Sequence, residues 1–187
     1  MKEYVILDLE WTSWRGNYFG KSLFFHKRKA WQKQEIIQIG AIKFDKNYKI
    51  IDRLNLYVKP KFNPILSNYI KNLTGINQEK LEKKGIAFTK SYKIFKKFCK
   101  GAKIFSNGAD NLIMKTNLHY NNLRDKKLKI KNISKILNKK YKIPKKFLPS
   151  AIIHTFFDYK LKKNNMHNAI HDCYNILKAL KKIKFIL

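Results

Sequence analysis

The chain has 187 residues and a formal net charge of +30, from 42 basic and 12 acidic side chains. With 44% hydrophobic and 14% aromatic residues it predicts one globular domain over residues 1–187, and composition excludes a disordered chain. Two cysteines exclude a disulfide scaffold, and no apolar run is long enough for a membrane span. Acidic residues interrupt the short N-terminal apolar run and no small-residue cleavage site follows, so it is not a secretion signal. We therefore expect a cytoplasmic protein with reduced thiols and no membrane partner.

The positive charge has two interpretations, and both stay open. A surface this basic would attract a polyanion such as nucleic acid. Alternatively, the charge reflects genome composition, because all but four of the basic residues are lysine and Asn, Ile, Phe and Tyr are abundant as well. Because carboxylates are so scarce, the position of each one carries information.

The N-terminal third of the chain has the pattern of β-strands. Apolar and β-branched residues predict strands at Tyr4–Trp11, Gln34–Asp45 and Ile50–Lys59. The short polar segment Asp45–Lys49 between the second and third strands favours a hairpin. We therefore expect three consecutive strands, the last two of them antiparallel.

Helices and single strands alternate in the middle of the chain. Short helices are expected at Ser67–Leu73 and Gln78–Lys84, and a longer one at Phe88–Lys100, where helical apolar spacing ends before a glycine. A strand at Ala102–Ser106 and a helix at Asp110–Asn121 follow. This order is typical of a sheet covered by helices.

The C-terminal part is expected to be mostly helical. A last strand is predicted at Leu128–Ile130, and breaks are predicted at Pro144, Pro149 and residues 162–165. The closing helix is expected at Ala169–Ile183. Together the elements predict an α/β fold, with a mixed central sheet of about five strands flanked by helices.

Two carboxylates on the first strand suggest a metal site. Asp8 and Glu10 are two residues apart, so their side chains lie on one face of the strand. Two like charges on a buried strand are tolerable when a cation lies between them, and hard divalent cations prefer carboxylate oxygens. The alternative is a strand end at which both carboxylates reach water.

Three distant residues are candidates for the same site. Asp110 lies at a strand-to-helix junction, where α/β folds place their sites, and His167 and Asp172 occur together in HNAIHD. Residues five apart on a helix do not share a face, so we place His167 in the loop before the closing helix and Asp172 in the second turn. Asp125 and Asp158 are expected to be solvated.

These motifs, in this order, resemble those of the DEDDh 3′→5′ exonucleases. The resemblance rests on Asp8 and Glu10 in DLEWT, Asp110 in FSNGAD, and His167 with Asp172 in HNAIHD. EIIQIGAIKFD resembles the family's second strand, and YVKPKFNPILSNYIKNLTGINQ is close to the Eri-type branch of RNA-trimming exonucleases. The resemblance covers most of the chain and implies a ribonuclease H-like three-layer sandwich.

The resemblance also implies a role for each residue of the motifs. Asp8 would bridge two Mg²⁺ or Mn²⁺ ions, Glu10 and Asp172 would complete one ion site, and Asp110 would hold the second ion largely through water. His167 would take the proton of the attacking water. The implied reaction removes nucleoside 5′-monophosphates from the 3′ end of single-stranded nucleic acid.

The substrate and the oligomeric state are less constrained. The Eri-like central segment favours RNA over DNA. A DNA exonuclease of the proofreading type and a catalytically weak nucleic-acid-binding module on the same fold stay open as alternatives. The sequence leaves the oligomeric state open, a homodimer included.

An insertion at about residues 13–34 suggests further nucleic-acid contacts. Its aromatic residues Trp14, Tyr18 and Trp31 alternate with basic ones, which suits base stacking in a basic groove. The alternative is a long loop whose aromatic residues pin it to the core. Including the LTGI segment, for which a turn and helix cap is the alternative, the candidate nucleic-acid contacts are Trp11, Thr12, Trp14, Arg15, Leu73, Thr74 and Asn107.

Overall fold

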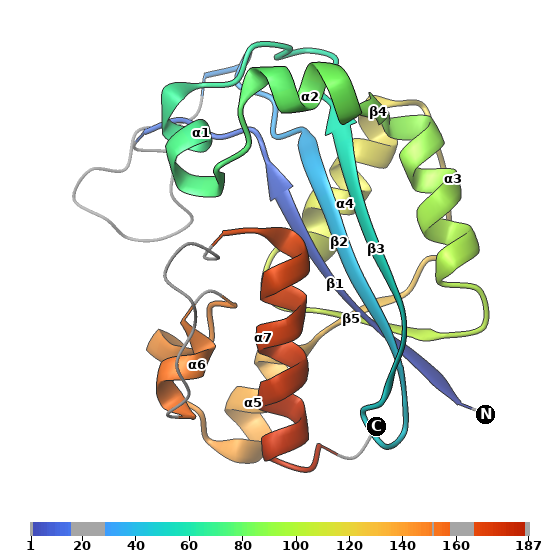
Figure 1. Ribbon diagram of the computed structural model, residues 1–187, viewed down its shortest axis with the longest axis vertical. Coiled ribbons are helices and arrows are strands. Elements are labelled where there is room, and N and C mark those ends of the chain that lie inside the picture. The colour runs from blue at the N-terminus through green and yellow to red at the C-terminus, as the bar shows by residue number, and fades with distance from the viewer. Residues whose placement is uncertain (1, 16–28, 151, 158–166, 186–187) are drawn as a thin grey trace.

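The computed structural model describes residues 2–15, 29–150, 152–157 and 167–185, and its centre is one mixed sheet (Figure 1). The six strands lie in the order β4-β3-β2-β1-β5-β6. β1, β2 and β3 are antiparallel neighbours, whereas β5 and β6 run parallel to β1 and β4 runs parallel to β3. The strands are β1 (Glu3–Trp11), β2 (Ile36–Asp45), β3 (Ile50–Lys59), β4 (Ile86–Ala87), β5 (Lys103–Ser106) and β6 (Ile130–Asn132).

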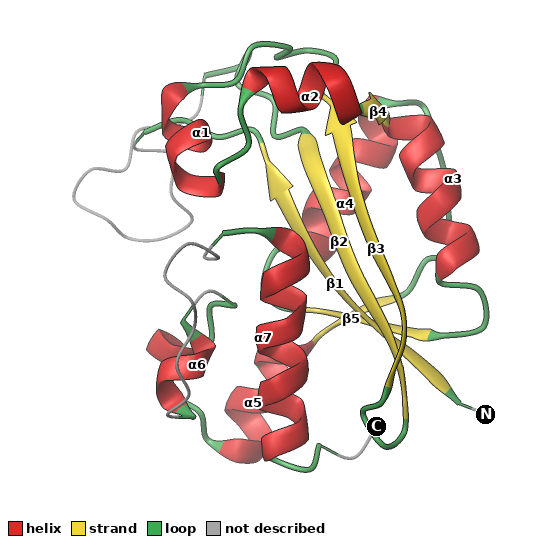
Figure 2. Cartoon of the chain, viewed as in Figure 1, coloured by secondary structure: helices red, strands yellow, loops and turns green. Residues whose placement is uncertain are grey.

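Helices cover both faces of this sheet (Figure 2). One apolar cluster joins the sheet to α5, α6 and α7, and a second joins the opposite face to α3 and α4. None of the helices in the described part of the chain is long and apolar enough to cross a membrane. The helices are α1 (Asn68–Thr74), α2 (Gln78–Lys84), α3 (Phe88–Phe98), α4 (Asp110–Tyr120), α5 (Ile133–Tyr141), α6 (Ile153–Phe156) and α7 (Ala169–Lys182), with a 3₁₀ turn η1 (Lys145–Phe147).

The alternation of side chains along β1 decides which face receives the acidic pair. Tyr4 and Ile6 pack in the cluster beneath α7, whereas Val5 and Leu7 pack in the cluster beneath α3 and α4. Because strand side chains alternate with a period of two, the even-numbered residues after Ile6 also face α7. The predicted common face of the two carboxylates is therefore confirmed.

Short polar signals end and begin the elements as expected. The Asp45 carboxylate accepts the N–H groups of Asn47 and Lys49 at 2.8 and 3.0 Å, which closes the predicted hairpin. Asn77 caps α2 through the N–H of Lys80. The sheet has one strand more than expected, because β4 has only two residues and leaves no periodic pattern.

Candidate active site

Asp110 reaches β1 at the point where β5 ends. The register of the parallel pair stops at Leu7 opposite Ser106, so β5 does not pair with the next residues of β1. Instead the Leu9 N–H donates to Asp110 Oδ1 at 3.1 Å. The first residue of α4 thus takes the place of a strand partner, and its carboxylate lies beside the acidic end of β1.

The turn before Asp110 is fixed from the neighbouring strand. Asn132, the last residue of β6, accepts the Gly108 N–H at 3.3 Å and donates to the Gly108 carbonyl at 2.8 Å. Gly108 has φ +96°, a conformation that favours glycine. The strand-to-helix junction is therefore held rigidly by two hydrogen bonds and one residue without a side chain.

The start of α7 packs directly on β2. Gly40 lies opposite Asp8 in the β1–β2 register, and a Cβ on Gly40 would lie 2.3 Å from the backbone carbonyl carbon of Ala169. Gln38 is fully buried and its side-chain oxygen accepts the Ala169 N–H at 3.2 Å. This close approach brings Asp172 to the site from the first turn of α7, not from the second turn as predicted.

Four buried carboxylates therefore share one site. Burial raises the pKa of Asp8 and Glu10 well above the usual range, and the charges of Asp110 and Asp172 raise both further. Burial also raises the pKa of Asp110 and of Asp172, each to about 7. The four carboxylates therefore disfavour one another's charged forms, and their oxygen atoms fit hard divalent cations as ligands.

His167 lies against two of these carboxylates. Ligand atoms of Glu10, His167 and Asp172 all lie within 4.8 Å of one another. As predicted, His167 precedes the helix: it is separated from α7 by the N-cap Asn168 and has φ +55°. Burial lowers the pKa of His167, which favours the neutral imidazole. The left-handed conformation is strained for a residue with a side chain, and such strain is often found at functional sites.

One cavity of about 490 Å³ is lined by all four carboxylates and by His167. It is also lined by residues that the sequence did not indicate, namely Ser134, Lys145, Leu148, Pro149 and Ser150. Lys145 could not be told apart from the many other lysines, and a serine has no distinctive pattern. Only the two prolines around this segment marked it as a break between helices.

Two of the seven candidate nucleic-acid contacts line this cavity, Trp11 and Asn107. The Asn107 amide donates to the Leu148 carbonyl at 2.5 Å and to Ser150 Oγ at 3.0 Å. Its Oδ1 is buried and has no hydrogen-bond partner among the described residues. Asn107 therefore ties one wall of the cavity together and keeps one free acceptor.

The two candidate threonines are engaged inside the protein. Thr12 Oγ1 donates to the Lys33 carbonyl at 2.6 Å and accepts the Glu35 N–H at 2.9 Å. Thr74 Oγ1 donates to the Ile70 carbonyl at 2.8 Å. These hydroxyl groups stabilise the chain, and their contact with nucleic acid stays a prediction.

The remaining candidates lie at the surface or in a small cluster. Trp14 packs edge to face on Trp31, with ring centroids 5.2 Å apart, and Trp31 is 54% exposed. Arg15 is exposed, and Leu73 packs against the apolar cluster of α1 and α2. Residues 16–28 of the insertion, Tyr18 included, lie outside the described residues.

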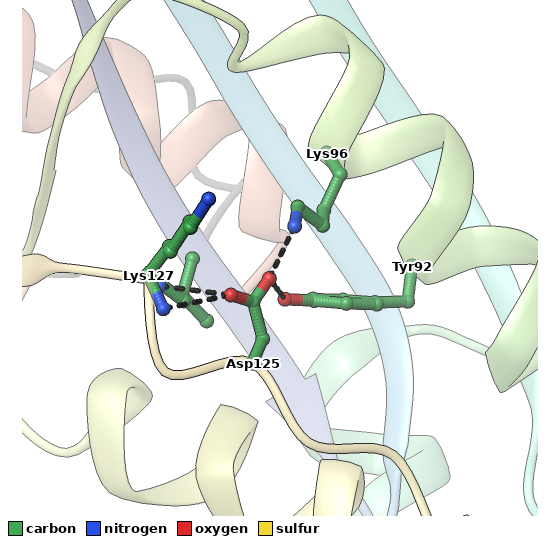
Figure 3. Close-up of polar contacts among 5 residues, drawn as sticks. Tyr92, Lys96, Asp125 and Lys127 are labelled. Carbon is green, nitrogen blue, oxygen red and sulfur yellow. Dashed lines mark hydrogen bonds and ion pairs between the residues drawn. The ribbon is translucent and has the colours of Figure 1, made fainter.

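Two other carboxylates have structural roles. Asp125 was expected to be solvated, which is wrong: its side chain is only 8% exposed, pairs with Lys96 at 2.5 Å and accepts the Tyr92 hydroxyl at 2.7 Å (Figure 3). The Lys96 ammonium holds the pKa of Asp125 down at about 2, with help from Tyr92. Glu35 accepts three backbone N–H groups of the loop after β3. Asp158 lies outside the described residues.

Comparisons with known proteins show the family to which the chain belongs. A family model described as Exonuclease matches residues 5–180. The 3′-5′ exonuclease eri1 of Schizosaccharomyces pombe is 46% identical over 52 residues, which are 27% of this chain and only 18% of that protein.

Two solved structures share the fold at low sequence identity. The nuclease domain of 3′hExo, a DEDDh family member bound to rAMP, has a TM-score of 0.79 and 20% identity, covering 97% of this chain and 91% of that one. The zinc-bound ExoI–ssDNA complex of E. coli has a TM-score of 0.72 and 14% identity, covering 98% and 41%. The predicted ribonuclease H-like fold is confirmed, and the chain belongs to the exonuclease family, as the DEDDh resemblance predicted.

Proposed function

We propose that this protein is a metal-dependent 3′→5′ exonuclease that removes nucleoside 5′-monophosphates from single-stranded RNA. One observation carries the proposal. Carboxylates from β1, α4 and α7, far apart in the sequence, meet with a histidine around one cavity. Their pKa values are all raised, so the arrangement is unfavourable unless cations neutralise it.

The four carboxylates would hold two divalent ions, either Mg²⁺ or Mn²⁺. Asp8, Glu10, Asp110 and Asp172 supply four negative charges, which match two divalent ions. When bound, such ions activate a water molecule and stabilise the leaving 3′-oxygen of an in-line displacement. With the charges balanced, the site no longer repels the phosphodiester of the substrate.

His167 would act as the general base. Burial lowers its pKa, so the imidazole is neutral and can accept a proton at physiological pH. It would take this proton from the water that attacks the terminal phosphorus, while the bond between phosphorus and the 3′-oxygen of the preceding nucleotide breaks. Its place next to Glu10 and Asp172 puts the base beside the groups that would hold the ions.

The choice of RNA is supported by the relatives. The rAMP bound to 3′hExo and the histone mRNA stem-loop recognised by a 3′-exonuclease of the same fold both favour a ribonucleotide substrate. The ssDNA in the ExoI complex favours the alternative, a DNA exonuclease on the same fold. Trp11 and Asn107 line the cavity and would contact the terminal nucleotide.

The test uses RNA and DNA strands of one sequence, each labelled at the 3′ end. We expect labelled mononucleotide to be released from RNA in Mg²⁺ or Mn²⁺, and not in EDTA. Asp8→Ala should abolish release, whereas Asp52→Ala, which removes an exposed carboxylate from β3, should not. Persistent turnover by the Asp8 variant would refute the site, and binding without turnover by the natural protein would indicate a binding module.

A further inference from the structure

A second cavity, of about 680 Å³, lies at the other end of β5 from the carboxylates. It is lined by the C-terminal end of α3, by Lys103 at the start of β5, by residues 127–129 before β6 and by Lys131 within it. The active-site cavity begins beyond the other end of β5, at Asn107. Lys103 and Ser106 alone are roughly 10 Å apart along the strand. The two cavities therefore share no lining residue and are separate sites.

Lysines dominate this second cavity, which we call the lysine cavity. Seven of its fourteen lining residues are lysines, whereas the whole chain has 42 basic residues in 187. Uniform enrichment of the chain in lysine therefore does not account for its composition. Lys103 is set apart from the others, because its Nζ lies over the Tyr4 ring, on the face of the sheet opposite to α3. The other six are Lys96, Lys97, Lys100, Lys127, Lys129 and Lys131.

Asp125 joins the two segments that carry these lysines. Its carboxylate pairs with Lys96 and accepts the Tyr92 hydroxyl, both from α3, and it also accepts the N–H groups of Lys127 and Leu128 at 3.0 and 3.1 Å (Figure 3). These contacts hold the end of α3 against the segment before β6. The walls of the lysine cavity are thus fixed without a ligand.

Five of the six lysines keep their charge unpaired. Only Lys96 has a carboxylate within ion-pairing distance among the residues that the structure describes. Lys129 and Lys131 line the cavity and are exposed, on either side of the buried Ile130. Lys97 and Lys100 are exposed at the end of α3. Lysines without a carboxylate partner among the described residues therefore line one concave surface.

The shape and charge of the lysine cavity select its ligand. Its floor is apolar, formed by Phe95, Ile104 and Leu128, and a low-dielectric concave surface concentrates the field of the charges around it. A flat membrane surface cannot enter a cavity, whereas a polyanionic chain can. We propose that the lysine cavity binds the phosphodiester backbone of nucleic acid upstream of the 3′ end. The choice of this polyanion rests on the proposed function.

The test compares two variants with the same change in net charge. The first neutralises the lysine cavity, and the second neutralises exposed lysines on α2, α3 and α5 that do not line it. The cavity variant is Lys97→Gln, Lys100→Gln, Lys129→Gln and Lys131→Gln. The control variant is Lys84→Gln, Lys90→Gln, Lys139→Gln and Lys140→Gln.

Binding is measured by fluorescence anisotropy with a labelled 20-nucleotide RNA in EDTA, which prevents turnover. The measured quantity is the slope of log affinity against log salt concentration. Its magnitude falls by about 0.7 for each phosphate contact that is lost, so the loss of four contacts should lower it by roughly 3. We expect the cavity variant to bind about tenfold more weakly or worse at 0.1 M salt, and the control variant to lose much less. Lys129→Gln with Lys131→Gln alone should give about half the change in slope.

Cleavage of a dinucleotide separates this proposal from the proposed function, because its single phosphodiester is the scissile bond and no upstream phosphate is left for the lysine cavity. We expect the cavity variant to cleave it at the natural rate, which also shows that the variant is folded. Equal loss of RNA binding in both quadruple variants, or no loss in either, would overturn the proposal, as would lysine-dependent binding to anionic vesicles and not to RNA. If the natural protein cleaves neither the dinucleotide nor the RNA strand in Mg²⁺ or Mn²⁺ while RNA binding still depends on these lysines, the proposed function fails and the lysine cavity stands.

Discussion

Without metal ions, the protein should lose stability as the pH rises from 5 to 8. Burial raises the pKa of Asp110 and of Asp172 from 3.8 to about 7, so between these values the folded state binds more protons than the unfolded state. The free energy of unfolding then falls as pH rises, and the stability that protonation gives is lost by the time pH passes the folded pKa. Asp8 and Glu10 act in the same direction.

The size of the effect follows from the same shift. One pKa unit corresponds to 1.36 kcal/mol, so one aspartate with a folded pKa of about 7 accounts for about 3 kcal/mol between pH 5 and pH 8. The lowered pKa of His167 opposes this trend, but it is one group against four. Divalent cations should remove the trend, because they bind the charged carboxylates of the folded state.

The assay is urea denaturation in EDTA and in Mg²⁺ at several pH values between 5 and 8. Asp172→Asn should make the metal-free protein more stable at pH 8 by up to about 4 kcal/mol and reduce the stabilisation by Mg²⁺. Asp52→Asn removes an exposed carboxylate and should change neither. Stability that is constant or rises with pH in EDTA would refute the shared acidic site, as would the same slope in Mg²⁺.

Three substitutions test other parts of the structure. His167→Ala should slow turnover by roughly 10²–10⁴-fold and leave the thermal shift by Mg²⁺ nearly intact, and an equal loss of both would contradict its role as base. Gly40→Ala places a methyl group 2.3 Å from Ala169, so we expect a lower melting temperature together with slower turnover; full activity would show that α7 does not need this approach. Asp125→Asn should reduce the free energy of unfolding by about 1–3 kcal/mol and leave dinucleotide cleavage unchanged, because it breaks the pair with Lys96 far from the carboxylates.

The sequence allowed local and periodic features to be predicted. The common face of Asp8 and Glu10 follows from the period of a strand, and the Asp45 hairpin and the Asn77 cap follow from side chains that bond to their own neighbours. Such interactions span only a few residues, so the sequence alone contains them. The same is true of His167 preceding α7, which the polar residues before the helix indicated.

Features that depend on packing between distant segments could not be predicted. Asp125 is 33 residues from Tyr92, and only the fold brings its carboxylate to α3. Lys145 and Ser150 line the active-site cavity because Leu148 packs with β5 and α7 and Asn107 bonds to Leu148 and Ser150, and no neighbour in sequence signals this. The last strand was predicted at Leu128–Ile130, but β6 begins at Ile130 and ends at Asn132. Its extent is set by pairing with β5, which the sequence does not reveal.

The segment EIIQIGA contains no residue of the active site, yet it determines where the start of α7 lies, and with it His167 and Asp172. Gln38 binds the first N–H of α7, and Gly40 leaves room for its backbone. The buried Cys173 thiol donates to the Gly40 carbonyl at 3.2 Å, one residue after Asp172. Repulsion between buried carboxylates would push α7 away from β1, and these three contacts oppose that movement. The backbone of β2 thus keeps Asp172 close to the other carboxylates even in the absence of the cations that neutralise them.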